Sequence, residues 1–309
     1  MSGAFPFSLR VPVICAPMFL VSGPKLVVAA CKAGIAGAFP APNARSIEEL
    51  DAWMLEIASS RAPDDGPWAL NLITHSTYTR LEQELRLVAE HKPPVVITAL
   101  GSPRPVMETV KAYGGLVFAD VVNLKLARKA AEAGVDGMAC ISAGAGGHTG
   151  HLSPFAFISG VREFFDGCVA VGGGVSDGAG ILGAIAAGAD LVYMGTRFLP
   201  TIESMAQTAY KEMVIAADAD DLVVSAAVTG TPASWLKPSL AAAGYDLANP
   251  GAAPARDYGG DAKRWRDIWA AGQGVGRSRT IESAARVVDT LALEYRAAID
   301  RLAQRTGCA

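Results

Sequence analysis

The stretch CISAGAGGHTGHLSPF, residues 140 to 155, places His148 and His151 in a run of glycines, although the whole chain has only four histidines. Imidazole exchanges protons near neutral pH, and glycines let a backbone approach a bound molecule closely. His148 is therefore a candidate for deprotonating a carbon acid or stabilising an anion. The spacing alone leaves a solvent-bonded loop histidine open as the alternative. His151 is interpreted as structural.

A second glycine cluster offers a phosphate site. In VAVGGGVSDGAGIL an apolar run leads into Gly172, Gly173 and Gly174, and a helix pattern starts shortly afterwards. Successive glycines expose backbone N–H groups, and a helix N-terminus adds its dipole, so an anion is favoured here. The next apolar run, in ADLVYMGTRFL, ends at Gly195 and Thr196, where we expect further donors at a helix start. The alternative is that these glycines only permit tight turns.

Two further stretches could contact a flat ring. Asn71, in WALNLITH, carries a carboxamide that can donate to and accept from a heterocycle edge. Ala16, Pro17 and Met18, in VICAPMFL, would place a stiff turn and a polarisable thioether beside such a ring. Met18 could equally be ordinary core, and His75 could face either this site or solvent.

The elements that must position these residues follow a βα rhythm. Short apolar runs alternate with amphipathic stretches, and several stretches end in Ala-Gly, which caps a helix before the next strand. The glycine clusters follow the late strands, which favours a closed (β/α)₈ TIM barrel over a doubly wound sheet. All the candidate residues above follow strands and would meet at one mouth. The eight expected strands are Pro12–Ala16, Ala36–Phe39, Trp68–Leu72, Val95–Leu100, Leu116–Ala119, Gly137–Ile141, Val169–Val171 and Leu191–Met194.

The rhythm is lost after about Pro200. Helices are expected over Met205–Asp218 and Thr280–Ala303, and the Pro-, Gly- and Ala-rich stretch between them is typical of a lid or a binding loop. We therefore expect one domain over residues 1–309. An irregular and helical C-terminal extension would pack over the barrel mouth, with residues 200–279 as a lid.

Composition excludes several classes of protein. A net charge of −3 without a Lys/Arg run argues against a nucleic-acid partner. Five scattered cysteines without CxxC spacing argue against a zinc site and against a disulfide framework. We therefore expect no metal, and we expect the protein in the reducing cytoplasm. Glycines and Asp190 interrupt the longest apolar run, so no membrane span is expected.

Taken in order, five stretches resemble one family. They are PVICAPM, ALNLI, AGAGGHTG, VGGGVSDGAGILGAIAAGADLVYMGTRFL and IWAAGQGVG. Together they resemble the FMN-dependent barrel enzymes of the nitronate monooxygenase (2-nitropropane dioxygenase) family, over nearly the whole chain. Relatives of that family include flavin-dependent enoyl-acyl-carrier-protein reductases and NADH:quinone reductases.

The resemblance implies a role for each candidate residue. His148 would be the catalytic histidine, and the C-terminal segment at Gln273 would return to the flavin. The remaining implied cofactor contacts fall into a phosphate group and a ring group. The phosphate group is Gly172, Gly173, Gly174, Gly195 and Thr196; the ring group is Ala16, Pro17, Met18, Asn71, Asp120 and Gly147.

Two departures from the family pattern bear on the substrate. The histidine motif in members usually reads Glu-Ala-Gly-Gly-His, and Gly144 here stands in the place of the acid. Asp120, after the fifth strand, stands where some relatives carry a lysine or a small hydroxyl residue. A carboxylate near the flavin would disfavour an anionic reduced ring unless a cation compensates or the side chain points elsewhere.

The activity implied is oxidation of alkyl nitronates by dioxygen to a carbonyl compound and nitrite, with FMN as cofactor and a small-molecule substrate. Two alternatives stay open at this point. One is an NAD(P)H-dependent flavin reductase of a quinone or an enoyl thioester, and the other is a non-catalytic flavin-binding protein. The resemblance also allows a homodimer.

Overall fold

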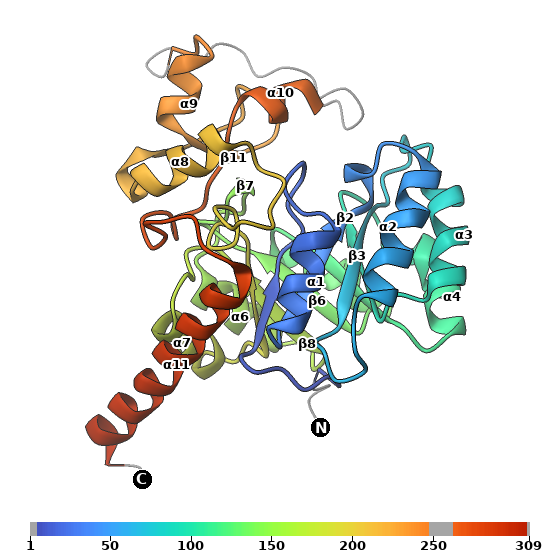
Figure 1. The fold of residues 1–309 in the computed structure, drawn as a ribbon. Helices are drawn as coiled ribbons and strands as arrows, with labels where there is room; N and C mark the ends of the chain where they lie inside the picture. Colours follow the sequence, from blue (N-terminus) through green and yellow to red (C-terminus); the bar gives the residue numbers. More distant parts are fainter. Residues whose placement is uncertain (1–4, 247–261, 308–309) are drawn as a thin grey trace.

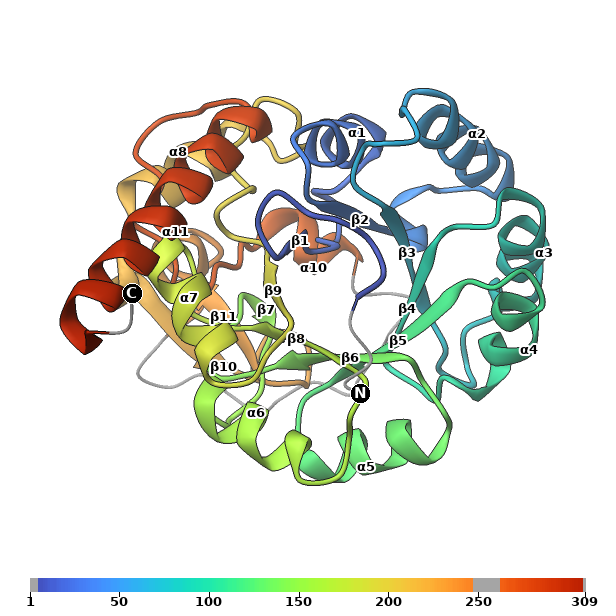
Figure 2. The same cartoon turned by 90° about the horizontal axis from the view of Figure 1, so that it is seen from below.

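The chain folds around a closed parallel barrel. A computed structural model describes residues 5–246 and 262–307. Within them the barrel strands follow the order β1-β2-β3-β4-β5-β6-β8-β9, and β9 pairs with β1 to close the ring. Figure 2 looks along the ring and shows the helices outside it. The strands are β1 Val13–Cys15, β2 Ala36–Pro40, β3 Trp68–Ile73, β4 Val95–Ala99, β5 Leu116–Val121, β6 Gly137–Ile141, β8 Cys168–Gly172 and β9 Leu191–Met194.

The barrel predicted from the sequence is confirmed, with each strand within a residue or two of its expected bounds. Helices cross between successive strands because Ala-Gly ends, such as Gly34 at φ 89° and Gly188 at φ 106°, reverse the chain. The crossover helices are α1 Pro24–Lys32, α2 Ile47–Ser59, α3 Leu81–His91, α4 Arg104–Ala112, α5 Leu124–Glu132, α6 Pro154–Arg162 and α7 Gly178–Ala186, with a 3₁₀ turn, η1, at Ala41–Asn43.

Two apolar layers hold the barrel together. Side chains that alternate along each strand point either outward, to pack under the helices, or inward, to fill the ring. The outward layer includes Val13, Leu70 and Val192, and the inward layer includes Ile14, Ala69 and Phe118. The ring is thus a packed core rather than a channel.

The segment after β9 adds a small antiparallel sheet that the sequence did not reveal. Strand β10 (Leu222–Ser225) pairs with β11 (Ala233–Leu236), and β11 pairs with the two-residue strand β7 (Gly147–His148) from the loop after β6. Figure 1 shows this sheet on one side of the barrel, together with helices α8 (Thr208–Ala216), α9 (Lys237–Ala242) and α10 (Ala262–Asp267). A 3₁₀ turn, η2, spans Ala219–Asp221. Part of the expected lid, residues 247–261, lies outside the described residues.

The chain after β9 does not start a helix at Thr196, so that expectation was wrong. Phe198 and Leu199 donate backbone hydrogen bonds to Gly195 and Thr196, which makes consecutive turns. The segment then runs beside the start of the last helix, α11 (Ala284–Thr306), because Thr201 pairs with Glu282. The expected helix over Met205–Asp218 accordingly begins only at Thr208.

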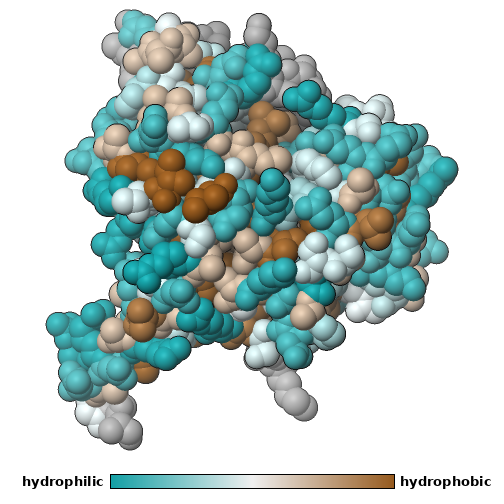
Figure 3. All heavy atoms as spheres, in the orientation of Figure 1, coloured by the Kyte–Doolittle hydropathy of each residue, from teal (hydrophilic) through white to brown (hydrophobic). Residues whose placement is uncertain are grey.

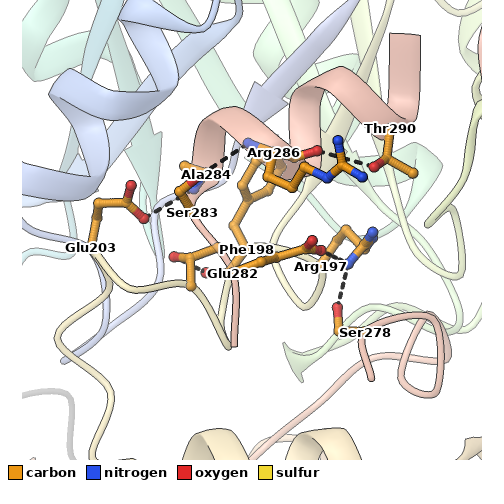
Figure 4. Close-up of polar contacts among 10 residues, drawn as sticks. Arg197, Phe198, Glu203, Ser278, Glu282, Ser283, Ala284, Arg286 and Thr290 are labelled. Atoms are coloured by element: carbon orange, nitrogen blue, oxygen red, sulfur yellow. Dashed lines mark hydrogen bonds and ion pairs between the residues drawn. The ribbon is translucent and has the colours of Figure 1, made fainter. Parts of the chain in front are cut away.

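Ionic and capping contacts fix α11 to that segment, as Figure 4 shows. The buried guanidinium of Arg197 donates to Ser278 Oγ at 2.7 Å and to Glu282 Oε1 at 3.1 Å. Glu203 accepts from the backbone N–H of Ala284 at 3.0 Å, at the first turn of the helix. The C-terminal segment is thereby tied to the carboxyl end of β9.

The surface is largely hydrophilic on the face drawn in Figure 3, with apolar atoms in small groups. In the part of the chain that the structure describes, no helix combines the length and apolar character needed to cross a membrane.

Candidate functional site

The turn after β8 requires glycine, both for its backbone conformation and because its neighbours lie close. Gly173 has φ 134° and Gly174 has φ 72°, conformations that side chains rarely adopt. A Cβ added to Gly173 would lie 2.3 Å from Ser142 Oγ and 2.7 Å from the Ala143 carbonyl oxygen. Helix α7 follows, capped by Asp177, which accepts from the Gly180 N–H at 2.7 Å. Only glycine fits at position 173.

The turn after β9 lies against the start of the chain. A Cβ added to Gly195 would contact Met18 Sδ at 3.3 Å, so the thioether of Met18 packs over this turn. Ala16 extends β1 by donating its N–H to the Met194 carbonyl at 3.0 Å, and Pro17 follows it. Thr196 Oγ1 accepts from the Gly272 N–H at 2.9 Å.

Asn43 holds the turn that carries Met18, and the sequence did not single it out. Its side-chain amide donates to the carbonyls of Met18 at 3.0 Å and Ser22 at 2.7 Å. It also accepts from the N–H of Leu20, whose φ of 61° is unusual for a leucine. A polar side chain shortly after the second expected strand is the sequence signal that could have identified Asn43, which the structure shows to be buried.

The C-terminal segment returns to the glycine turns at Gln273. The Gln273 N–H donates to the Gly144 carbonyl at 2.8 Å. A Cβ added to Gly146 would lie 2.6 Å from the Gly272 nitrogen, so the two backbones are in direct contact. A Cβ at Gly144 would lie 2.6 Å from Gln273 Oε1, with the Gly174 nitrogen 3.3 Å away. The Gln273 carboxamide thus occupies the space in which a side chain at position 144 would begin.

His148 lies on strand β7 rather than in an irregular loop. Its backbone is opposite Ala233 of β11, and Gly147, at φ 66°, is opposite Ser234. The imidazole is half-buried and meets the indole of Trp265 edge to face, with ring centroids 5.3 Å apart. Strand pairing of its backbone and the ring contact with Trp265 hold the imidazole in position.

A polar group lies at the carboxyl end of the barrel interior. Asn71 Nδ2 donates to the Ile97 carbonyl at 3.2 Å and approaches Asp120 Oδ2 at 3.4 Å. Asp120 falls within β5, one residue before its end, rather than after the strand as expected. Burial raises the pKa of Asp120 to about 7, while Tyr193 and Asn71 pull it down. Burial and the Asp120 charge raise the pKa of Tyr193.

His75 lies in the loop after β3, where its Nδ1 is 2.8 Å from Thr77 Oγ1. Tyr193 and Trp265, by contrast, were missed. Tyr193 could have been found from its place two residues before Gly195 on an expected strand, whereas only the tertiary fold brings Trp265 to His148.

Comparison with known proteins identifies the family of the chain. Residues 74–294 match the model of the nitronate monooxygenase domain. The chain belongs to the nitronate monooxygenase family. This family of oxidoreductases is flavin-dependent, so the family and the class of cofactor predicted from the sequence are confirmed.

Individual relatives differ in their stated activities. A nitronate monooxygenase of Paraburkholderia phytofirmans is 28% identical, and the alignment covers 95% of this chain and 94% of that protein. A (3aS,4S,5R,7aS)-5-hydroxy-7a-methyl-1-oxo-octahydro-1H-indene-4-carboxyl-CoA dehydrogenase of Rhodococcus jostii is 30% identical over 74% of this chain and 63% of its own length. Among solved structures, FabK from Thermotoga maritima has a TM-score of 0.81 at 25% identity and covers 96% of both chains.

Proposed function

We propose that the protein is an FMN-dependent nitronate monooxygenase that oxidises alkyl nitronates with dioxygen to a carbonyl compound and nitrite. The observation that carries the proposal is the convergence of two glycine turns, the return segment and the histidine loop. Gly174, Thr196, Gly272 and Gly144 come from distant parts of the chain and are linked by direct contacts. Family membership supports it.

The residues present fit FMN. The glycine turn after β8 leads into the N-terminus of α7, whose backbone N–H groups would be donors to a phosphate, and Thr196 adds a hydroxyl from the turn after β9. Inside the barrel, Asp120 Oδ1 and the Tyr193 hydroxyl are buried without a hydrogen-bond partner among the described residues. Asn71 and Asp120 would present polar groups to the edge of a heterocycle, and Met18 would pack beside its ring.

In this mechanism the cofactor supplies the electron transfer and the protein supplies position and proton control. Asn71 would hold the polar edge of the ring, and the turns after β8 and β9 would fix the phosphate. His148 would accept the α-proton when the neutral nitroalkane enters, because an imidazole base is matched to neutral pH. A substrate that enters as the nitronate has already lost that proton.

The test separates these two substrates. His148→Asn should slow turnover of a neutral nitroalkane by roughly a hundredfold or more, yet leave turnover of propyl-2-nitronate near that of the parent. His151→Asn, in the same loop but exposed, is the matched control and should change neither. Oxygen uptake with FMN-loaded protein gives both rates. Equal losses on both substrates would remove His148 from the role of base.

A second candidate function is favoured by the Rhodococcus relative, whose name is that of a carboxyl-CoA dehydrogenase. The same barrel and flavin would then act as an NAD(P)H-linked reductase or dehydrogenase of a thioester. Anaerobic mixing with NADH or NADPH decides between them, because bleaching of the yellow colour within seconds would favour the second candidate. Oxygen uptake with propyl-2-nitronate and no nicotinamide would favour the first and would also exclude a non-catalytic flavin-binding protein.

A further inference from the structure

Three polar side chains face the barrel interior near its carboxyl end. Asn71, Asp120 and Tyr193 come from β3, β5 and β9, so they are far apart in the sequence. Each stands two residues after an inward apolar side chain on the same strand, and alternation along a strand places it on the same inner face. The apolar residues beneath them are Ala69, Phe118 and Leu191.

This layer is poorly satisfied. Asn71 Nδ2 and Asp120 Oδ2 are 3.4 Å apart, which is long for a hydrogen bond, and the same nitrogen also donates to the Ile97 carbonyl. Asp120 Oδ1 and the Tyr193 hydroxyl have no partner in hydrogen-bond geometry within residues 5–246 and 262–307, although Tyr193 is near enough to act on the carboxyl. Buried polar atoms without partners are costly, so a layer of this kind indicates a polar ligand or a proton-exchanging role.

Nothing in the described residues neutralises a charge on Asp120. The groups that act on its pKa are Tyr193 and Asn71, and both are uncharged. The neighbouring thiols of Cys140 on β6 and Cys15 on β1 are also neutral at physiological pH, since burial raises the pKa of Cys140 to about 12 and that of Cys15 further. A second negative charge in this layer would carry a large desolvation and repulsion cost, because no positive group balances it.

We propose that Asp120, supported by Tyr193 and Asn71, takes up a proton from solvent when the cofactor is reduced. The inference rests on the FMN site of the proposed function. An organic substrate, or dithionite in the test, supplies two electrons, and the cofactor with one proton then gains one negative charge. The Asp120 carboxylate binds a second proton and becomes a neutral carboxylic acid, so the layer never holds two charges. Asp120 is a positioning and proton-holding residue, and no bond of the substrate changes at it.

The pH dependence follows from the raised pKa of Asp120. With a pKa raised to about 7, the carboxyl should already carry its proton in the oxidised protein below that pH, so reduction should take up one proton. Above about pH 7 it is ionised before reduction, so reduction takes up two. Each coupled proton shifts a two-electron potential by about 30 mV per pH unit. The slope should therefore steepen from about 30 to about 60 mV per pH unit above neutrality.

The experiment measures the midpoint potential of FMN-loaded protein between pH 6 and 9, with dithionite and reference dyes. Asp120→Asn keeps the size of the side chain and removes the proton site, so its slope should stay near 30 mV per pH unit throughout. Tyr193→Phe keeps the carboxyl and should keep the steeper slope. Asp166→Asn, an exposed carboxyl on the surface, should match the parent.

A second readout needs no variant. The reduced-minus-oxidised infrared spectrum of the parent at pH 8 should show a carboxylic acid forming on reduction. FMN-loaded parent with a slope of about 30 mV per pH unit above pH 7, or without the acid band, would overturn the role of Asp120 while leaving the proposed function intact. A protein that takes up no FMN would refute the proposed function, and this inference with it.

Discussion

At the scale of single residues, individual glycines differ in whether their position could accept a side chain. Gly173 combines a positive φ with two close oxygen contacts, whereas Gly183, on α7, has no atom within 4 Å of an added Cβ. Both positions are glycine and lie in the same βα unit. Comparing them therefore distinguishes a position that requires glycine from one that merely has it. The sequence could mark the cluster GGG but could not show which of its members is obligatory.

Gly173→Ala should abolish FMN retention. The added methyl group would have to displace Ser142 or the turn itself, which moves the backbone donors away from the phosphate position. Gly183→Ala is the matched control and should retain FMN with stability raised by roughly 0.5–1 kcal/mol. Flavin absorbance after gel filtration measures the first effect, and urea denaturation measures the second. A yellow Gly173→Ala protein with parental FMN affinity would contradict the assignment of this turn.

Asp120 should also affect the stability of the FMN-free protein. Its pKa is about 7 in the folded chain and 3.8 in a model peptide, so the folded state favours the protonated form. The contribution is complete below about pH 4 and is lost as the pH rises through 7. Between pH 5 and pH 8 the parent should therefore lose more stability than Asp120→Asn. Urea midpoints at the two values test this, and parallel losses would show that Asp120 titrates normally.

At the scale of elements, the small sheet β10-β11-β7 fixes the backbone position of His148. Periodicity could not reveal β7, because two residues carry no alternation, and β10 is only half-buried. The eight barrel strands were predictable because each is a short, largely buried and mostly apolar run, although β3 and β5 also carry Asn71 and Asp120. The fold was therefore readable from local patterns, whereas the support of the imidazole by Ala233 and Trp265 depended on tertiary contacts.

The attachment of α11 can be measured through its ion pair. Arg197 has 7% of its side chain exposed and Glu282 has 23%, so Glu282→Gln should destabilise the protein by about 2 kcal/mol, less than a fully buried pair would. Glu82→Gln is the control, because the Arg86–Glu82 pair is largely exposed, and it should cost less than about 1 kcal/mol. If the two variants lose the same free energy of unfolding in chemical denaturation, the Arg197–Glu282 pair contributes no more than an exposed pair.

At the scale of the whole molecule, the candidate site draws on nearly the full length of the chain. Met18 from the first βα unit packs on Gly195 from the last, and Gly272 returns from the C-terminal segment to Thr196. Motif order could predict that these stretches belong together, since parallel barrel strands share one carboxyl end. It could not predict that Gln273 fills the space beside Gly144, because that contact depends on the path of a long segment without periodic signal.

A ligand held by the first, last and intermediate parts of the chain should stabilise the molecule as one unit. Free FMN at a hundred times its Kd should add about 2.7 kcal/mol to the free energy of unfolding, and removing FMN should lower Tm correspondingly. Riboflavin has the same ring but no phosphate, so it should give a much smaller shift if the turns after β8 and β9 hold the phosphate. Scanning calorimetry of FMN-free protein with each compound measures both. Equal shifts would place the phosphate outside the glycine turns, and a second transition that FMN leaves unmoved would show that the C-terminal segment unfolds independently of the site.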